Sequence, residues 1–98
     1  MEVQVYYFGN FKAITKKESQ RIVLSNEATI EELLKHLVKE YSRLETLLFK
    51  GSSLKADIII GVNQRQAKKI DEPLRDNDCI YLFVAMAGGS KGRRCYFA

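Results

Sequence analysis

The chain has 98 residues, of which 46% are hydrophobic and 29% charged, a composition typical of one ordinary globular domain. The net charge of +4 comes from the end of the chain, because residues 1–89 carry 13 basic and 12 acidic side chains while residues 90–98 carry three basic ones. A nucleic-acid-binding domain would spread its basic side chains over the folded surface, so we expect no nucleic-acid partner.

The cysteines and the first residues bear on the compartment. Cys79 and Cys95 are too few for a disulfide framework or a metal site, and Cys95 would persist as a free thiol only in a reducing compartment. Residues 1–5 lack the basic and apolar regions of a signal peptide, and no apolar run approaches the roughly 18 residues of a membrane span. We therefore expect a cytoplasmic protein that binds no metal and contacts no membrane.

The beginning of the chain predicts two strands. Residues 2–8 alternate with a period of two, which is typical of a strand, and the following side chains share one face: Val3, Val5 and Tyr7. Phe8 continues the alternation on the opposite, outer face. We expect residues 10–17 to form a polar loop and residues 19–24 to form a second strand, antiparallel to the first.

A capping box then marks the start of a helix. The Thr29 side chain can accept the N–H of Glu32, while the Glu32 carboxylate reaches back to the N–H of Thr29. Apolar residues recur at three- and four-residue spacing after it, at Ile30, Leu33, Leu34, Leu37, Val38 and Tyr41. The pattern predicts a helix over residues 30–41 and a second helical turn over residues 44–49 that Gly51 ends.

The second half of the chain predicts the remaining strands. Residues 57–62 are rich in isoleucine and too short for a helix, which indicates a buried strand. A turn at Asn63-Gln64 leads to a short strand through Gln66, and Pro73 with residues 75–78 predicts another turn. Residues 79–84 predict the last strand. This order of elements indicates an α+β fold in which a mixed sheet packs on one main helix.

Gly88-Gly89 follows the last strand, and the polar segment 90–98 follows the diglycine. Because glycine has no side chain, two of them form a thin thread that can enter a narrow channel in a partner. Taken alone, a diglycine equally fits a turn. The final residues, Cys95-Tyr96-Phe97-Ala98, formally fit a prenylation box, although its middle residues are aromatic rather than small and aliphatic.

Four segments resemble the MoaD-like sulfur carriers, which belong to the ubiquitin-like MoaD/ThiS superfamily. Residues 3–9 are similar to the family's opening strand, residues 29–34 to its helix start, and Gly61-Val62-Asn63-Gln64 to its central strand. Residues 73–78, the next apolar strand and Gly88-Gly89 match its ending. The resemblance implies a β-grasp sulfur-carrier domain over residues 1–89 and a basic tail over residues 90–98.

The resemblance also implies that partner enzymes supply the chemistry and that the chain itself is no enzyme and binds no cofactor. A ubiquitin-activating-type enzyme would use ATP to adenylate the carboxylate of Gly89, to which Gly88 gives access. A sulfur donor would then displace AMP and leave a thiocarboxylate. Its sulfur would pass to the large subunit of molybdopterin synthase, in molybdenum-cofactor biosynthesis, or to another acceptor.

The chain departs from the family in three ways. It has Val84-Ala85 where two prolines are frequent, and a third apolar docking position falls near Gln66 or Ala67. It also continues for nine residues past Gly89. Because a peptide bond at Gly89 leaves no carboxylate to adenylate, we expect a processing protease to remove residues 90–98.

The outer face of the predicted sheet carries the expected partner-binding residues. Phe8 and Phe83 match the family's docking positions, and the strand alternation places Tyr6 and Tyr81 on the same face. An exposed apolar patch of this kind marks an interface, whereas cross-strand pairing that only stiffens the sheet is the alternative. His36 lies off the apolar face of its helix, so we expect it in solvent.

Two other functions stay open. The same activation could serve a ubiquitin-like modifier used for protein conjugation or tRNA thiolation. A ubiquitin-like interaction module without activation would instead use Gly88-Gly89 as a hinge and the basic tail as a docking arm for an acidic partner. The sequence contains no nucleophile–base pair, metal cluster or phosphate loop that would indicate an independent enzyme.

Overall fold

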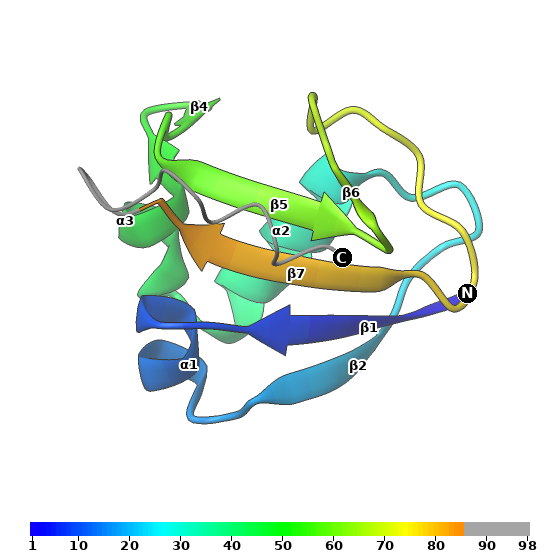
Figure 1. Ribbon diagram of the computed structural model, residues 1–98, viewed down its shortest axis with the longest axis horizontal. Coiled ribbons are helices and arrows are strands. Elements are labelled where there is room, and N and C mark those ends of the chain that lie inside the picture. The colour runs from blue at the N-terminus through cyan, green and yellow to red at the C-terminus, as the bar shows by residue number, and fades with distance from the viewer. Residues whose placement is uncertain (86–98) are drawn as a thin grey trace.

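The computed structural model describes residues 1–85, so the predictions on Gly88, Gly89, Cys95 and the 90–98 tail lie outside the described residues. The main sheet has five strands in the order β2-β1-β7-β5-β6 (Figure 1). Its strands are β1 (Glu2–Tyr7), β2 (Ser19–Val23), β5 (Ile58–Val62), β6 (Arg65–Gln66) and β7 (Cys79–Val84). The other elements are α1 (Asn10–Thr15), α2 (Ile30–Glu40), α3 (Leu44–Leu48), β3 (Phe49–Lys50) and β4 (Ser53–Leu54).

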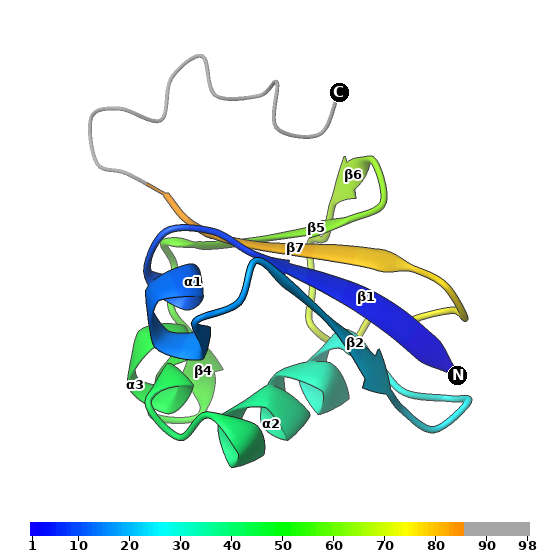
Figure 2. The same ribbon diagram turned by 90° about the horizontal axis from the view of Figure 1, so that it is seen from below.

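The sheet is mixed, and the three helices lie on one of its faces (Figure 2). The central strands β1 and β7 run parallel to each other, while β2 and β5 pair antiparallel with them on either side. The predicted α+β fold, a mixed sheet packed on one main helix, is confirmed. Within residues 1–85, none of the helices is long and apolar enough to cross a membrane.

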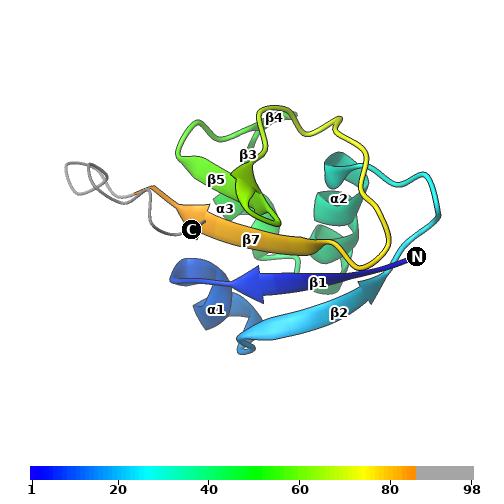
Figure 3. The same cartoon turned by 45° about the vertical axis from the view of Figure 1, so that its right-hand side comes forward.

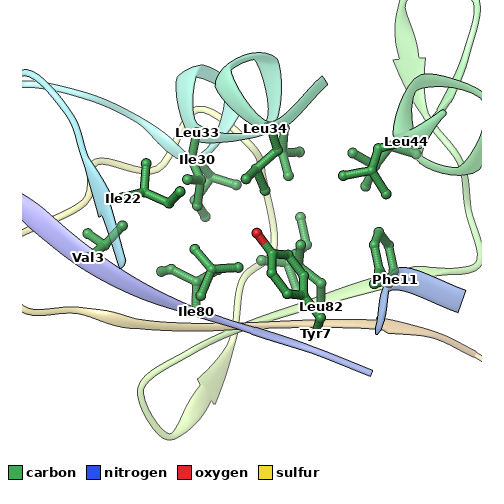
Figure 4. Close-up of a cluster of buried hydrophobic side chains, with 14 of the residues drawn as sticks. Val3, Tyr7, Phe11, Ile22, Ile30, Leu33, Leu34, Leu44, Ile80 and Leu82 are labelled. Carbon is green, nitrogen blue, oxygen red and sulfur yellow. The ribbon is translucent and has the colours of Figure 1, made fainter. Parts of the chain in front are cut away.

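The helix α2 provides the main contact with the sheet. The predicted capping box is present, because the Thr29 hydroxyl accepts the Glu32 N–H at 3.4 Å and the Glu32 carboxylate accepts the Thr29 N–H at 3.2 Å. The apolar side of the helix is fully buried: Ile30, Leu33, Leu34 and Leu37 are each 0% exposed. Ile30, Leu33 and Leu34 point toward the side chains of β1 and β7 (Figure 4). Burial of each of the four side chains contributes about 1.5–3 kcal/mol.

The prediction of a polar loop over residues 10–17 is wrong, because residues 10–15 form the helix α1. Gly9 makes the turn into it with a positive φ of 56°, and Lys16 ends it in the left-handed conformation. A six-residue helix has almost no stability of its own in water. Tertiary burial supplies it here, since Phe11 is 0% exposed and points into the core (Figure 4).

The predicted helical turn at residues 44–49 is present as α3, but it does not end at Gly51. Phe49 is already extended and pairs with Leu54 in a small antiparallel sheet formed by β3 and β4. Gly51 lies in the turn of this hairpin, where its positive φ of 65° suits the absence of a side chain. Neither of these two-residue strands is long enough to produce a readable alternation in the sequence.

The turn before β7 fixes the register of the sheet. Asp78, the residue just before β7, holds this turn together. Its carboxylate accepts hydrogen bonds from the Arg75 N–H at 2.8 Å and from the Asn63 side-chain amide at 3.0 Å. The Asn63 side-chain oxygen in turn accepts the Cys79 N–H at 3.0 Å. These bonds tie the end of β5 to the start of β7. They therefore determine which side chains of β7 face the helices and which face away.

Candidate docking face and the end of β7

Four aromatic side chains gather on the sheet face opposite the helices. Tyr6 of β1 lies opposite Tyr81 of β7 in the parallel register, and their rings stack with centroids 5.0 Å apart. Phe8 stacks on Phe83 at 4.6 Å and contacts Tyr81 at 6.4 Å. We call these four residues the docking face. The predicted partner-binding residues are thus brought together, in the spacing that favours aromatic pairs.

The exposure of the four rings is uneven. Phe8 is 40% exposed, Tyr6 and Tyr81 are half-buried, and Phe83 is only 8% exposed. The expectation of an exposed apolar patch is therefore right for Phe8 and wrong for Phe83, whose ring is stacked on that of Phe8. Phe8 and the two half-buried tyrosines form the accessible part of the docking face. The cross-strand pairing that we expected as an alternative is present as well, whereas the role of these residues in partner binding stays a prediction.

The tyrosines give the docking face a neutral polar rim. Partial burial, together with the neighbouring Cys79 and Tyr6, raises the pKa of the Tyr81 hydroxyl above its usual value. The hydroxyl thus stays protonated near neutral pH and can donate a hydrogen bond to a partner. A neutral, aromatic surface with hydroxyl groups at its edge suits a protein interface, where tyrosine is enriched.

A further apolar residue borders this face and was not predicted. Ile59 of β5 lies opposite Phe83 in the antiparallel register and is half-buried, whereas its neighbours Ile58 and Ile60 are buried. The sequence of β5 reads as one continuous apolar run, and only the pairing with β7 assigns Ile59 to the outer face. The third docking position expected near Gln66 or Ala67 is not part of the ring cluster: Gln66 is exposed and Ala67 packs against the edge of the core.

The strand β7, which carries Tyr81 and Phe83, leads along the chain toward the diglycine segment. The last paired residue of β7, Val84, lies opposite Ile58, and the Ala85 N–H donates to the Asp57 carbonyl at 2.7 Å. The strand is thus fastened to the sheet up to its final described residue. Gly89 follows Ala85 by four residues, a distance of at most about 14 Å for an extended chain. The strand β7 therefore carries two members of the docking face, Tyr81 and Phe83, and also leads to the diglycine.

The remaining chemistry-bearing side chains are dispersed. His36 is exposed on α2, as predicted. Cys79 is half-buried at the start of β7 and forms no disulfide within the described part of the chain. Among residues 1–85 there is no group of three or more histidine, cysteine or acidic side chains that could hold a metal ion.

Comparison with known proteins agrees with this geometry. The model of the ThiS family matches residues 5–89, which include both glycines of the diglycine. The chain is 26% identical over 92 residues to small archaeal modifier protein 3 of Haloferax volcanii, covering 91% of this chain and all of that protein. Among solved structures, it superimposes on SAMP1 of Haloferax volcanii with a TM-score of 0.82 at 22% identity, covering 91% of this chain and all of SAMP1.

A second similar structure is that of a complex of two subunits. It is the complex of subunits 1 and 2 of the molybdopterin-converting factor of Helicobacter pylori, with a TM-score of 0.60 and 28% identity, covering 91% of this chain and all of the matched chain. The expected β-grasp fold is confirmed by the similarity to these ubiquitin-like proteins. The chain belongs to the ThiS family and is a small ubiquitin-like carrier or modifier protein.

Proposed function

We propose that the protein is a sulfur carrier whose working group is the carboxylate of Gly89, freed by removal of residues 90–98. The observation that carries the proposal is the continuity of β7, which bears Tyr81 and Phe83 and is hydrogen-bonded to the sheet up to Ala85. A partner that docks on this face holds the start of the diglycine segment in place. The family match, which ends at Gly89, supports the same assignment.

The proposed chemistry takes place on the partner. A Gly89 carboxylate oxygen attacks the α-phosphorus of ATP in an activating enzyme, and pyrophosphate leaves. The acyl adenylate is a good electrophile because AMP is a far better leaving group than hydroxide. Sulfide adds to the carbonyl, AMP departs, and the thiocarboxylate remains. Gly88 would let the terminus pass through a narrow channel, since it carries no side chain.

The proposed sulfur acceptor is the large subunit of molybdopterin synthase. The similarity to the Helicobacter pylori converting factor, whose structure is a complex of two subunits, supports this pathway. The docking face would then contact two partners in turn, first the activating enzyme and then the synthase subunit. Successive use of one face ensures that a carrier bound for activation is released before it delivers its sulfur.

A second candidate is a ubiquitin-like modifier that is conjugated to proteins or serves tRNA thiolation. The match to small archaeal modifier protein 3 over the full length of that protein favours it specifically. Both candidates share the activation step and differ only in the acceptor. Adducts of higher mass on cellular proteins would favour the modifier, whereas restored molybdopterin synthesis in cells that lack their own small subunit would favour the carrier.

Intact mass spectrometry tests the activation step. The chain ending at Gly89 and the full 98-residue chain are each incubated with the cognate activating enzyme, ATP and sulfide. We expect the shorter chain to gain the mass that corresponds to replacement of one oxygen by sulfur, and the full chain to stay unchanged. If the chain ending at Gly89 forms neither adenylate nor thiocarboxylate, the proposal is wrong and the interaction module without activation becomes the better explanation.

A further inference from the structure

A second surface, distinct from the docking face, lies along the outer edge of β5. An open groove of about 760 Å³ runs between β4 on one side and residues 66–70 on the other. In Figure 1 both β4 and β6 lie on the same side of β5. The lining of the groove mixes apolar and polar side chains and consists of Ser52, Ser53, Leu54, Lys55, Ala56, Ile58, Ile60, Gln66, Ala67, Lys68, Lys69 and Ile70.

The edge of β5 that faces this groove is paired with another strand over only part of its length. The strand β6 pairs only with Gly61 and Val62, and one further bond runs from the Ala67 N–H to the Ile60 carbonyl at 2.8 Å. The chain then diverges from β5. The N–H of Ile58 is occupied by the Lys55 carbonyl at 3.2 Å, but no strand lies opposite Ile58 on this side within residues 1–85. An extended segment can add to such an edge.

The charge of the groove indicates which kind of peptide segment could bind there. Its lining contains Lys55, Lys68 and Lys69 and no acidic residue. Within the described residues, none of these three ammonium groups takes part in an ion pair. The nearby Glu72 is engaged elsewhere, because its carboxylate accepts the backbone N–H groups of Lys68 and Lys69 at 2.8 and 3.3 Å and pairs with Arg65 at 2.7 Å. The lining of the groove therefore combines apolar side chains with positive charge.

We propose that this groove binds an acidic, extended peptide segment of a partner protein. The apolar side chains of the segment would lie against the partly buried Leu54, Ala67 and Ile70, and its carboxylates would face the three lysines. The chain's own 90–98 tail is an unsuitable occupant, since its charged residues are all basic. The proposal does not depend on the sulfur-carrier function, because the groove opens at the sheet edge and the docking face lies on the flat of the sheet.

Nuclear magnetic resonance titration of the ¹⁵N-labelled full chain tests the proposal. The probes are two capped hexapeptides, the acidic DVIVDE and its basic counterpart KVIVKK. We expect the acidic peptide to shift the amide signals of residues 58–60 and 66–70 and to bind at least about tenfold more tightly than the basic one. Its affinity should also fall as salt is raised, because the lysines are near solvent.

Charge reversal at the groove has a matched control elsewhere on the chain. The triple variant K55E/K68E/K69E should lower the affinity for the acidic peptide by about tenfold or more. The triple variant K16E/K35E/K39E has the same net charge, and two of its sites, Lys35 and Lys39, line a smaller groove between β2 and α2. This control should retain most of the affinity. Phe8→Glu, which alters the docking face, should leave peptide binding unchanged even if the proposed function fails.

Four outcomes would overturn the proposal. The first is equal affinity for the two peptides or no binding at millimolar concentration, and the second is a shift pattern centred on β2 or the docking face. The third is an equal loss of affinity in both triple variants. The fourth is concentration-dependent shifts of residues 58–60 without any peptide, which would mean that a second copy of the chain occupies the groove.

Discussion

The two faces of the sheet are built from the same strands and differ in what covers them. The strands β1 and β7 lie side by side in the sheet (Figure 3). On β1, Tyr7 is 2% exposed on the face that the helices cover, whereas the adjacent Tyr6 is half-buried on the other face and stacks on Tyr81. On β7, Leu82 is fully buried under the helices, while Tyr81 is only half-buried. On β1, the inner face carries Val3, Val5 and Tyr7 whereas the outer face also carries Glu2 and Gln4, and the helices close only the inner face. The face left open is the one available to partners.

The faces also differ in how their polar atoms are satisfied. On the inner face the Tyr7 hydroxyl donates to the Gln20 side-chain oxygen at 2.9 Å, which also accepts the Tyr41 hydroxyl at 3.1 Å. The Gln20 amide then donates to both carboxylate oxygens of Glu40 at 3.0 and 3.2 Å. This network fastens the edge strand β2 to the end of α2. On the inner face, therefore, aromatic residues serve stability, and truncations on the two faces should separate stability from docking.

The largest effect on stability is expected in the core, where α2 packs on the inner face of the sheet. Leu34→Ala removes a side chain that is 0% exposed, and the cavity it leaves should lower the free energy of unfolding by about 3 kcal/mol. Urea unfolding followed by circular dichroism measures this. Val23→Ala, at an apolar residue that is 66% exposed, is the control and should change stability by less than about 0.5 kcal/mol. Similar losses in the two variants would contradict the assignment of the core.

A smaller, pH-dependent effect is expected for Tyr7→Phe. Loss of the hydrogen bond to Gln20 should cost about 1 kcal/mol at neutral pH. Burial, with Tyr41 and Glu40 nearby, raises the pKa of the Tyr7 hydroxyl above that of the unfolded chain. The native tyrosine therefore stabilises the fold fully below about pH 10 and loses that contribution as the pH rises further.

Urea unfolding between pH 7 and pH 11 compares the two proteins. The stability of the wild-type chain should fall more steeply above about pH 10 than that of Tyr7→Phe, because the variant has no hydroxyl to ionise at this position. The other tyrosines titrate in both proteins, so the difference between the two curves isolates Tyr7. Parallel curves over the whole range would show that the hydroxyl is not buried in solution.

The smallest effect on stability is expected on the outer face. Phe8→Ala removes ring contacts with Phe83 and Tyr81, but the side chain is 40% exposed, so the loss should be below about 1 kcal/mol. Thermal unfolding of the variant beside Leu34→Ala provides the measurement. A loss as large as that of Leu34→Ala would mean that the aromatic cluster is a second core and not a surface kept for partners.

Most of the sheet and the main helix could be predicted from sequence, because their signals are local. The alternation of β1, the capping box at Thr29 and the apolar side of α2 each depend on residues close together in the chain. The helix α1 could not be predicted, because it is stabilised by the burial of Phe11 in the core and not by a local signal in the sequence. The same holds for the exposure of Phe83 and the position of Ile59, which depend on the pairing of β7 with β1 and β5.

The candidate site, too, could be predicted from the sequence only in part. The four members of the docking face follow from strand alternation, and the structure adds their stacking distances and unequal exposure. The roles of Gly88 and Gly89 came from the family resemblance and stay predictions, because these residues lie outside residues 1–85. The groove beside β5 has no signal in the sequence. Lys55 is more than ten residues away from Lys68 and Lys69 along the chain, and folding alone brings it close to the 66–70 segment.

The rate of ATP–pyrophosphate exchange by the cognate activating enzyme tests the docking face most directly, using the chain that ends at Gly89. Phe8 and Val23 are the two large apolar side chains classed as exposed within residues 1–85, so Phe8→Glu and Val23→Glu are a matched pair. The account predicts that Phe8→Glu lowers kcat/KM by at least about tenfold while Val23→Glu stays within about twofold of the unchanged chain. Equal rates in the two variants, with both folded by circular dichroism, would contradict it.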